Sequence, residues 1–230
     1  MTTDILKEII DTKNTTLCFS ADFTKTKDLI KWIHITGPYI CILKTHIDML
    51  DDYNPGIIEE FIKLKKQYNF LILEDRKFAD IGKTFYNQLF NGIYKIADWA
   101  DIITIHGICS DGMLNYISSI NNKSVPSILI VSDMSSKNNI IDNNYKSRCY
   151  EIAKKYNNLV LGFITQSKFI DDSNFFFMTP GIQLNNKSVI DQQYKTPQQA
   201  YLNGSDIIVV GSGIYLSTTP YETINKYLIK

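Results

Sequence analysis

Short runs of apolar and β-branched residues recur along the chain, mostly about 25 to 35 residues apart. Each run is almost continuously apolar, which is typical of strands buried on both faces of a parallel sheet. Segments with helical spacing lie between the runs, for example around Leu29, Ile30 and Ile33. The runs number eight, at residues 16–19, 39–43, 70–73, 102–105, 127–131, 159–164, 175–178 and 207–210. Eight alternations of strand and helix predict an α/β fold, a closed (β/α)8 TIM barrel, because an open doubly wound sheet has fewer strands.

The length and charge of the chain limit its organisation and its partners. A length of 230 residues suits one barrel domain over residues 1–230 better than two compact domains. The 24 basic residues balance 24 acidic ones, and the sequence pI is about 6.8. Bulk charge gives no indication of nucleic-acid or membrane binding, so we expect a small-molecule partner.

The four cysteines, Cys18, Cys41, Cys109 and Cys149, match neither a metal-binding spacing nor a C-x-x-C redox pair. Cys18 and Cys41 fall inside apolar runs, where a free thiol behaves as a small core residue. No apolar stretch reaches the length of a bilayer span, and the N-terminus lacks a signal-peptide core. We therefore expect a soluble, unprocessed protein of the cytoplasm.

Polar residues follow almost every apolar run at its carboxyl end. In a barrel of this type these ends open onto one face, where loops build the active site. The residues are Ser20 and Asp22 after the first run, Lys44, His46 and Asp48 after the second, Asp75 and Lys77 after the third, His106 after the fourth, Asp133 and Ser135 after the fifth, Pro180 and Gly181 after the seventh, and Gly211 and Ser212 after the eighth. We expect the active site on this face.

Residues 74–82, Glu-Asp-Arg-Lys-Phe-Ala-Asp-Ile-Gly, crowd acids and bases onto the end of the third strand. Asp75 and Lys77 point to the same face if the strand continues that far, and Asp80 follows a turn later. Lys44 would join them in an alternating array of lysines and aspartates. A buried ammonium aimed at a carbon that becomes negative stabilises the carbanion and then protonates it. An isolated charge run is more often a solvated surface segment, so the context decides its interpretation.

The context is a series of motifs that resembles orotidine 5′-phosphate decarboxylase over almost the whole chain, in order. The motifs are Ser20-Ala-Asp22, Lys44-Thr-His46-Ile-Asp48, the segment 74–82, Met134-Ser-Ser136, Thr179-Pro-Gly-Ile-Gln183, Gln192-Gln-Tyr194 and Gly204-Ser-Asp-Ile-Ile-Val-Val-Gly211. The segment 74–82 is highly specific, whereas Ser-Ala-Asp or Thr-Pro-Gly alone is weak. The chain is most similar to the eukaryotic form, which in animals is the decarboxylase domain of uridine monophosphate synthase. We expect no transferase domain in this sequence.

The resemblance implies a decarboxylation of orotidine 5′-monophosphate to uridine 5′-monophosphate, in pyrimidine biosynthesis, without cofactor or metal. By analogy, Asp75 lies against the departing carboxylate and Lys77 protonates carbon 6 of the ring. Lys44 and Asp80 complete the charged array.

Members of the resembled family are homodimers in which residues of one protomer reach into the site of the other. The matching residues of this chain are Asp80, Ile81 and Thr84. The resemblance therefore implies a homodimer with Asp80 and Thr84 at the partner's site.

The resemblance also implies contacts to the sugar. Asp22 and Lys44 would hold ribose hydroxyls, with His46 close to them. His46 could equally be a hydrogen-bonded histidine at a strand end. His106 fits a structural role better than a catalytic one.

The ring and the remaining substrate contacts follow from the same motifs. Ser135 would read the edge of the pyrimidine, with Met134 and Pro180 near the ring. The other substrate-binding residues by this resemblance are Ser20, Gln192, Tyr194, Gly211 and Ser212.

The chain departs from the family pattern at the phosphate site. The family has Gly-Arg-Gly after the eighth strand, where this chain has Gly211-Ser212-Gly213. A guanidinium gives phosphate two charge-assisted bonds and a serine hydroxyl gives one neutral bond, a loss on the order of 3 kcal/mol or about a hundredfold in affinity. Arg76 and Arg148 are the only arginines, and neither obviously substitutes. Main-chain amides of Ser212 and Gly213 can still bind an anion, and Lys187 and Lys195 flank the phosphate loop.

Two other interpretations stay open. Ser212 is the feature that supports a catalytically impaired nucleotide-binding or regulatory protein on the same barrel. The magnesium-dependent sugar-phosphate decarboxylases of this suprafamily share the Asp-x-Lys-x-x-Asp pattern of Asp75, Lys77 and Asp80. Those enzymes, however, have an acid where Lys44 stands and need a set of metal ligands that this sequence does not show.

Overall fold

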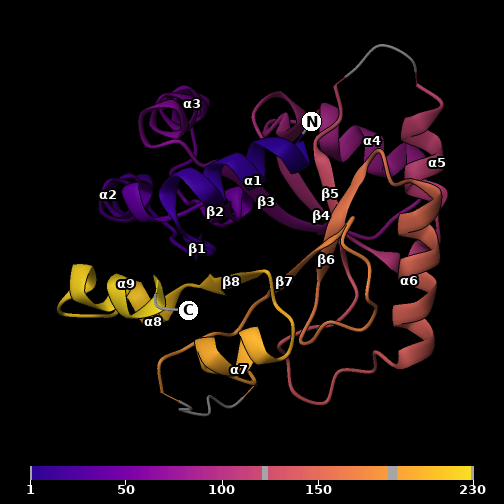
Figure 1. Cartoon of the computed structure of the whole chain (residues 1–230). Helices are drawn as coiled ribbons and strands as arrows, with labels where there is room; N and C mark the ends of the chain where they lie inside the picture. The colour runs from indigo at the N-terminus through magenta and orange to yellow at the C-terminus, as the bar shows by residue number, and fades with distance from the viewer. Residues whose placement is uncertain (1, 121–123, 186–190, 229–230) are drawn as a thin grey trace.

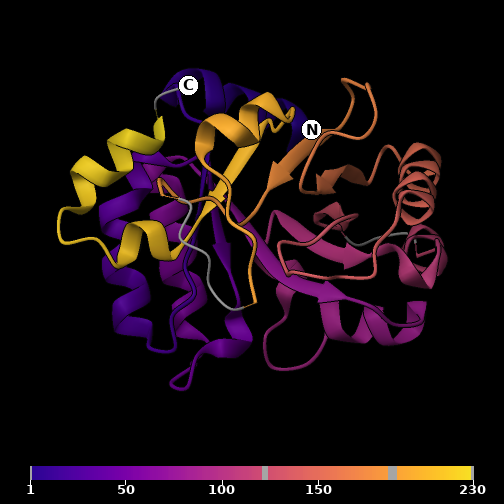
Figure 2. The same ribbon diagram turned by 90° about the horizontal axis from the view of Figure 1, so that it is seen from below.

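The structure, a computed structural model, describes residues 2–120, 124–185 and 191–228. Within these residues eight parallel strands pair in chain order, and β8 pairs with β1 to close a barrel (Figure 1). Helices surround the strands on the outside, as the view from below in Figure 2 also shows. The predicted (β/α)8 TIM barrel is therefore confirmed.

The strands follow the predicted apolar runs. Their bounds are β1 (Leu17–Ser20), β2 (Ile42–Thr45), β3 (Leu71–Phe78), β4 (Ile102–His106), β5 (Ser127–Val131), β6 (Val160–Ile164), β7 (Phe176–Thr179) and β8 (Ile207–Val210). β2 begins later than predicted, because Gly37–Tyr39 forms the 3-10 helix η1. β3 continues further than predicted and includes the charged residues up to Phe78.

The helices alternate with the strands. Their bounds are α1 (Thr2–Lys13), α2 (Thr26–Thr36), α3 (Gly56–Tyr68), α4 (Gly82–Phe90), α5 (Gly112–Ser118), α6 (Asn143–Lys155), α7 (Pro197–Leu202), α8 (Ser212–Tyr215) and α9 (Pro220–Leu228), with short 3-10 helices η2 (Ile47–Met49), η3 (Ile96–Asp98) and η4 (Gly107–Cys109). No helix in the described ranges has both the length and the apolar character needed to span a membrane.

Side chains of the strands alternate between two apolar cores. Residues such as Phe19, Leu43 and Ile72 pack outward against the helices. Residues such as Cys18 and Ile42 fill the barrel interior. This alternation is the period of two that a strand imposes, and it sets which residues point into the barrel.

Helix α1 closes the amino-terminal end of the barrel. Its buried residues Leu6 and Ile9 belong to the core inside the barrel. At its last residue, the Lys13 ammonium lies within hydrogen-bond distance, 2.6 to 3.1 Å, of four main-chain carbonyl oxygens that precede β2 and β3, and its three N–H groups are shared among them. These carbonyl oxygens belong to Gly37, Ile40, Tyr68 and Asn69. The opposite end of the barrel is left open for a site.

A β-bulge in β3 places the charged residues at that open end. The register between β3 and β4 shifts between Glu74 and Phe78. Within the bulge Lys77 has φ of 52°, the left-handed region that residues other than glycine seldom occupy. The sequence predicted that a continuing strand would bring Asp75 and Lys77 to one face. The strand does continue, as far as Phe78, and the bulge sets the direction in which the Lys77 side chain leaves the strand.

Candidate active site

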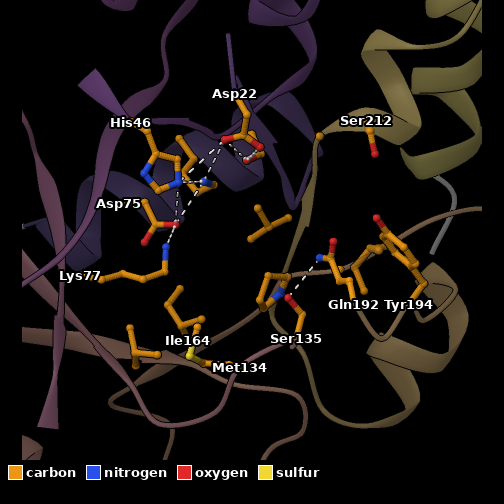
Figure 3. A pocket seen from close by; sticks show the side chains of 18 of the residues that line it. Asp22, His46, Asp75, Lys77, Met134, Ser135, Ile164, Gln192, Tyr194 and Ser212 are labelled. Atoms are coloured by element: carbon orange, nitrogen blue, oxygen red, sulfur yellow. Dashed lines mark hydrogen bonds and ion pairs between the residues drawn. The ribbon is translucent and has the colours of Figure 1, made fainter. Parts of the chain in front are cut away.

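A cavity of about 350 Å³ opens at the carboxyl ends of the strands. Thirteen of the sixteen predicted site residues line it, at two ends that Figure 3 shows. Figure 3 shows Asp22, His46, Asp75 and Lys77 at one end and Ser135, Gln192, Tyr194 and Ser212 toward the other. The remaining predicted residues that line the cavity are Ser20, Lys44, Met134, Pro180 and Gly211.

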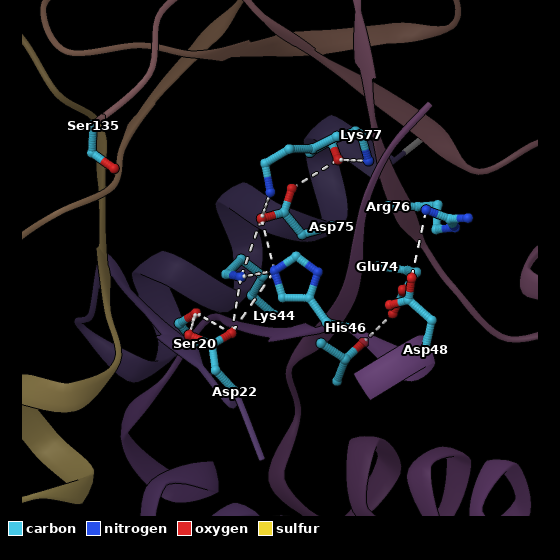
Figure 4. A network of polar contacts seen from close by, with 12 residues as sticks. Ser20, Asp22, Lys44, His46, Asp48, Glu74, Asp75, Arg76, Lys77 and Ser135 are labelled. Atoms are coloured by element: carbon cyan, nitrogen blue, oxygen red, sulfur yellow. Dashed lines mark hydrogen bonds and ion pairs between the residues drawn. The ribbon is translucent and has the colours of Figure 1, made fainter. Parts of the chain in front are cut away.

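Two lysines and two aspartates form an alternating array at the first end (Figure 4). Asp75 Oδ2 lies 2.7 Å from Lys77 Nζ and 3.1 Å from Lys44 Nζ. Lys44 Nζ also lies 3.3 Å from Asp22 Oδ1. Alternation follows from the topology, because β1, β2 and β3 are neighbours and present these residues at adjacent strand ends. The array brings together three of the four predicted catalytic residues.

The array fixes the charges of its members. Burial would raise the pKa of Asp75, but the Lys44 and Lys77 ammonium groups outweigh burial and hold this pKa far below its usual range. Burial would lower the pKa of Lys44, but Asp75 and Asp22 raise it above its usual range. Both groups are therefore fully charged at neutral pH.

His46 joins the array as a neutral partner. Burial, followed by the nearby Lys44 charge, lowers the pKa of His46 to about 4. The neutral ring nitrogen Nε2 accepts a hydrogen bond from Lys44 Nζ at 2.8 Å. His46 therefore orients the ammonium of Lys44 and adds no charge. His106, at the end of β4, is not among the residues that line the cavity in the described part of the chain.

The Ser20 hydroxyl holds the carboxylate of Asp22 at the edge of the array. Its Oγ donates to Asp22 Oδ2 at 2.8 Å. Burial raises the pKa of Asp22, but Lys44 and the Ser20 hydroxyl more than offset it, so the pKa is lowered. Asp22 is thus an ionised hydrogen-bond acceptor at the cavity wall, and its predicted contact with sugar hydroxyls stays a prediction.

The loops that follow β5 and β7 meet at the wall of the cavity. Gln192 Nε2 donates to the Ser135 hydroxyl at 3.1 Å, and Gln193 N donates to the carbonyl of Ser135 at 2.7 Å. Gly181 has φ of 76°, and a Cβ there would lie 2.6 Å from the carbonyl oxygen of Gln193. The predicted Thr-Pro-Gly motif therefore needs its glycine where the two loops approach.

The far end of the cavity is lined by hydroxyl and amide groups. Ser212 is the first residue of α8, and its hydroxyl accepts from Gln183 Nε2 at 3.4 Å. Tyr194 and Tyr215 also line the cavity. Lys44 and Lys77 are the only cationic residues among the described residues that line the cavity, and both belong to the array.

The other cations named from the sequence lie elsewhere. Lys195 donates to the carbonyl of Gln166, and Arg76 pairs with Asp48 at 3.5 Å. Arg148 lies in α6, beside a separate hollow. Lys187 falls outside the described residues. No lysine or arginine of the described part of the chain therefore takes the place of the missing arginine.

Three predicted site residues lie outside this cavity. Asp80 and Ile81 follow β3, and Asp80 Oδ1 accepts from the Ile81 N–H at 2.7 Å. Ile81 is 69% exposed, although it is a large apolar residue. Thr84 lies in α4 and lines a separate surface hollow. Their role at a partner's site stays a prediction.

Sequence reasoning missed several residues of the cavity wall. They are Val131, Asp133, Ile164, Gly181, Ile182, Val209 and Tyr215. Asp133 and Gly181 stood among the polar residues after strands, but no role was given to them. Val131, Ile164 and Val209 are ordinary strand residues in the sequence, and only their inward alternation marks them.

The chain matches the family model described as "Orotidine 5'-phosphate decarboxylase / HUMPS family" over residues 15–227. The chain belongs to this family. The resemblance read from the motifs is confirmed, and with it the prediction that the chain is an enzyme of the orotidine 5′-phosphate decarboxylase family.

Known relatives agree with this assignment. The orotidine 5′-phosphate decarboxylase of Rhizopus oryzae is 39% identical over 214 residues, which cover 91% of this chain and 81% of that protein. The enzyme of the same name from Pachysolen tannophilus is 40% identical over 218 residues, with the same shares of each chain covered.

Solved structures of the same fold include two archaeal proteins. Orotidine 5′-phosphate decarboxylase from Pyrococcus horikoshii superposes with a TM-score of 0.70 at 19% identity, covering 92% of this chain and 97% of that one. The orotidine 5′-monophosphate decarboxylase from Methanocaldococcus jannaschii, complexed with the inhibitor BMP, gives the same TM-score and identity, covering 93% and 97%. At this identity the likeness shows the fold alone.

Proposed function

We propose that this chain decarboxylates orotidine 5′-monophosphate to uridine 5′-monophosphate in pyrimidine biosynthesis. The observation that carries the proposal is the array Lys44–Asp75–Lys77, in which both lysines lie within 3.1 Å of one carboxylate oxygen. Family membership supports the substrate, and the array supports the chemistry. We also propose that residues 1–230 form one such domain in the cytoplasm, where the four cysteines, all outside disulfides, would stay reduced.

In the proposed reaction the bond between carbon 6 and the substrate carboxylate breaks, and the electron pair stays on carbon 6. Carbon dioxide leaves, and the Lys77 ammonium gives its proton to carbon 6. Lys77 then regains a proton from solvent, so charge and atoms balance. A fixed ammonium stabilises negative charge on the carbon before it donates the proton.

Asp75 and Lys44 would prepare the site for this step. Asp75 stays ionised because Lys44 and Lys77 neutralise it, so it can stand against the substrate carboxylate. That contact destabilises the bound carboxylate and is relieved as carbon dioxide leaves. Lys44, with Asp22 and His46 on either side, would hold the ribose hydroxyls.

The substrate phosphate would lie at the far end, near Gln192, Tyr194 and Ser212. The hydroxyl and amide groups there support a weaker grip on phosphate than an arginine would give. We further propose that the enzyme is a homodimer in which Asp80 and Thr84 reach the partner's site. The exposed Ile81 supports an apolar contact at this position.

The direct test is loss of orotidine 5′-monophosphate absorbance after mixing with the enzyme. We expect turnover by the wild-type chain and loss of at least about a thousandfold in kcat for Lys77→Met, because the proton donor is gone. Lys31→Met removes an exposed lysine from α2 and should keep full activity. A folded wild-type protein without turnover at millimolar substrate would refute the proposal.

A second candidate function is nucleotide binding without catalysis. The observation that favours it is Ser212 together with the absence of a cation among the described residues at the phosphate end. Calorimetry separates the two functions, since nucleotide binding without turnover supports the second. A chelator that stops turnover would instead point to metal-dependent chemistry.

A further inference from the structure

One buried hydroxyl contacts both residues of the proposed chemical step. Thr104 lies in β4, two residues after Ile102, so its side chain points into the barrel. The residue is fully buried, with 0% of its surface exposed. Its Oγ donates to Asp75 Oδ1 at 2.8 Å and accepts from the main-chain N–H of Lys77 at 2.9 Å. Because a hydroxyl has one hydrogen, the direction of both bonds is fixed.

The first bond sets the rotation of the Asp75 carboxylate. With Oδ1 held by Thr104, the other oxygen, Oδ2, faces Lys77 Nζ at 2.7 Å and Lys44 Nζ at 3.1 Å. A carboxylate free to rotate would not keep one oxygen for the two lysines. The Thr104 hydroxyl therefore holds Oδ1 of Asp75 in place and leaves Oδ2 to face the cavity.

The second bond holds the strained main chain of Lys77. Its φ of 52° lies in the left-handed region, which persists only where neighbours hold it. The ladder between β3 and β4 shifts at this point, and the Thr104 hydroxyl is the acceptor for the Lys77 N–H. The same atom thus fixes the start of the Lys77 side chain and the carboxylate that its ammonium contacts.

We infer that Thr104 is a positioning residue for decarboxylation, which holds Asp75 and Lys77 in the relative geometry that proton transfer requires. Thr104 is not among the described residues that line the cavity, so it acts through Asp75 and Lys77. The inference rests on the proposed function and names the residue that pre-organises its reacting groups.

The test compares Thr104→Val, which keeps the shape and removes the hydroxyl, with Thr104→Ser, which keeps the hydroxyl. Loss of a hydrogen bond to a charged group should lower the kcat of Thr104→Val by about 10- to 100-fold. KM should change by less than about threefold, because the substrate contacts stay in place. Thr104→Ser should keep kcat within about threefold of the wild type.

Thr36→Val is the matched control. Thr36 is equally buried, and its hydroxyl donates to the carbonyl of Trp32 within α2, away from the cavity. Both valine variants should melt at a lower temperature than the wild type, but only Thr104→Val should lose kcat. A purely structural role for Thr104 would make the two variants behave alike.

Two results would overturn the inference. One is a folded Thr104→Val with kcat within about threefold of an active wild type. The other is a Thr104→Ser as impaired as Thr104→Val, because the hydroxyl would then not be the cause. If Thr104→Val does not fold, Thr104→Cys is measured in its place, because a thiol is only a weak hydrogen-bond donor. A kcat of Thr104→Cys within about threefold of the wild type would then overturn the inference. A wild type without turnover refutes the proposed function itself, and the inference with it.

Discussion

At the scale of single residues, the lysine–aspartate array lies at one end of the cavity, and no described lysine or arginine lines the other end. Lys44, Asp75 and Lys77 supply fixed charge where a bond would break. Ser212 supplies a neutral hydroxyl where the phosphate would bind. Chemistry and binding are thus separated in space, and each can be tested by its own substitution.

Ser212→Arg should strengthen phosphate binding. A guanidinium in place of the hydroxyl adds charge-assisted bonds, so we expect KM for orotidine 5′-monophosphate to fall by about 10- to 100-fold. Steady-state kinetics measures this change. Gln198→Arg adds the same charge at an exposed position of α7 and should leave KM unchanged. An unchanged or raised KM in Ser212→Arg would contradict the role of this position.

The residues with formal charge were predictable from the sequence, and the hydroxyl that supports them was not. Lys44, Asp75 and Lys77 stood out because they follow strands whose ends open onto one face and because they lie in motifs that resemble the family. Thr104 gave no such signal, because threonine is an ordinary residue in a strand. Its position beside Asp75 depends on the register and on the bulge in β3, which only the structure shows.

At the scale of elements, buried groups fix the connections between strands. Glu74, in β3, is fully buried and accepts hydrogen bonds from the Thr45 hydroxyl at 2.7 Å and from the Ile47 N–H. These donors lie on either side of His46. Glu74 therefore holds the turn from β2 to η2 that carries this histidine.

Glu74→Gln should change how stability depends on pH. Burial outweighs the hydrogen bonds and raises the pKa of Glu74 from 4.5 to about 8. Between these values the folded state binds a proton that the unfolded state does not. The Glu74 contribution to stability therefore falls as pH rises, by up to about 1.4 kcal/mol per pH unit. Glutamine cannot titrate, so the free energy of unfolding of the variant, measured by chemical unfolding, should rise relative to that of the wild type from pH 5.5 to 7.5. The same dependence of this free energy on pH in both proteins would contradict this expectation.

Lys13→Met should loosen the closed end of the barrel. The ammonium shares its three N–H groups among four carbonyl oxygens, so its loss should lower the free energy of unfolding by about 2 to 3 kcal/mol. Lys7→Met, at an exposed position of the same helix, should cost less than about 0.5 kcal/mol. Equal losses in urea unfolding would show that the carbonyl contacts of Lys13 do not stabilise α1.

The strands themselves were predictable because continuous apolar runs have few alternatives in a chain of this length. The residues at which the strands begin and end were harder to predict. β3 extends through charged residues that resemble a loop in sequence, because the bulge lets polar side chains point into the cavity while the ladder continues. The local sequence does not show that a bulge will let the strand continue through charged residues.

At the scale of the whole molecule, one protomer leaves the predicted site incomplete. Asp80 and Thr84 lie outside the cavity of their own chain. Ile81, between them in sequence, is exposed. The proposed site therefore needs a second copy of the chain to supply Asp80.

Mixing two inactive variants should restore activity. In a dimer of Lys77→Met with Asp80→Asn, one site keeps both native residues and the other has neither. Random exchange of subunits in an equal mixture should recover up to about a quarter of wild-type activity. Each variant alone is the control, and sedimentation measures the dimer. Exchange without recovery would contradict sharing of the site.

The most direct test of the proposed decarboxylation is release of carbon dioxide from orotidine 5′-monophosphate labelled in its carboxylate, measured for the wild-type chain with and without chelator. We expect one carbon dioxide for each uridine 5′-monophosphate formed, at a rate that the chelator does not change and that Lys77→Met abolishes. Nucleotide binding without carbon dioxide release would contradict it.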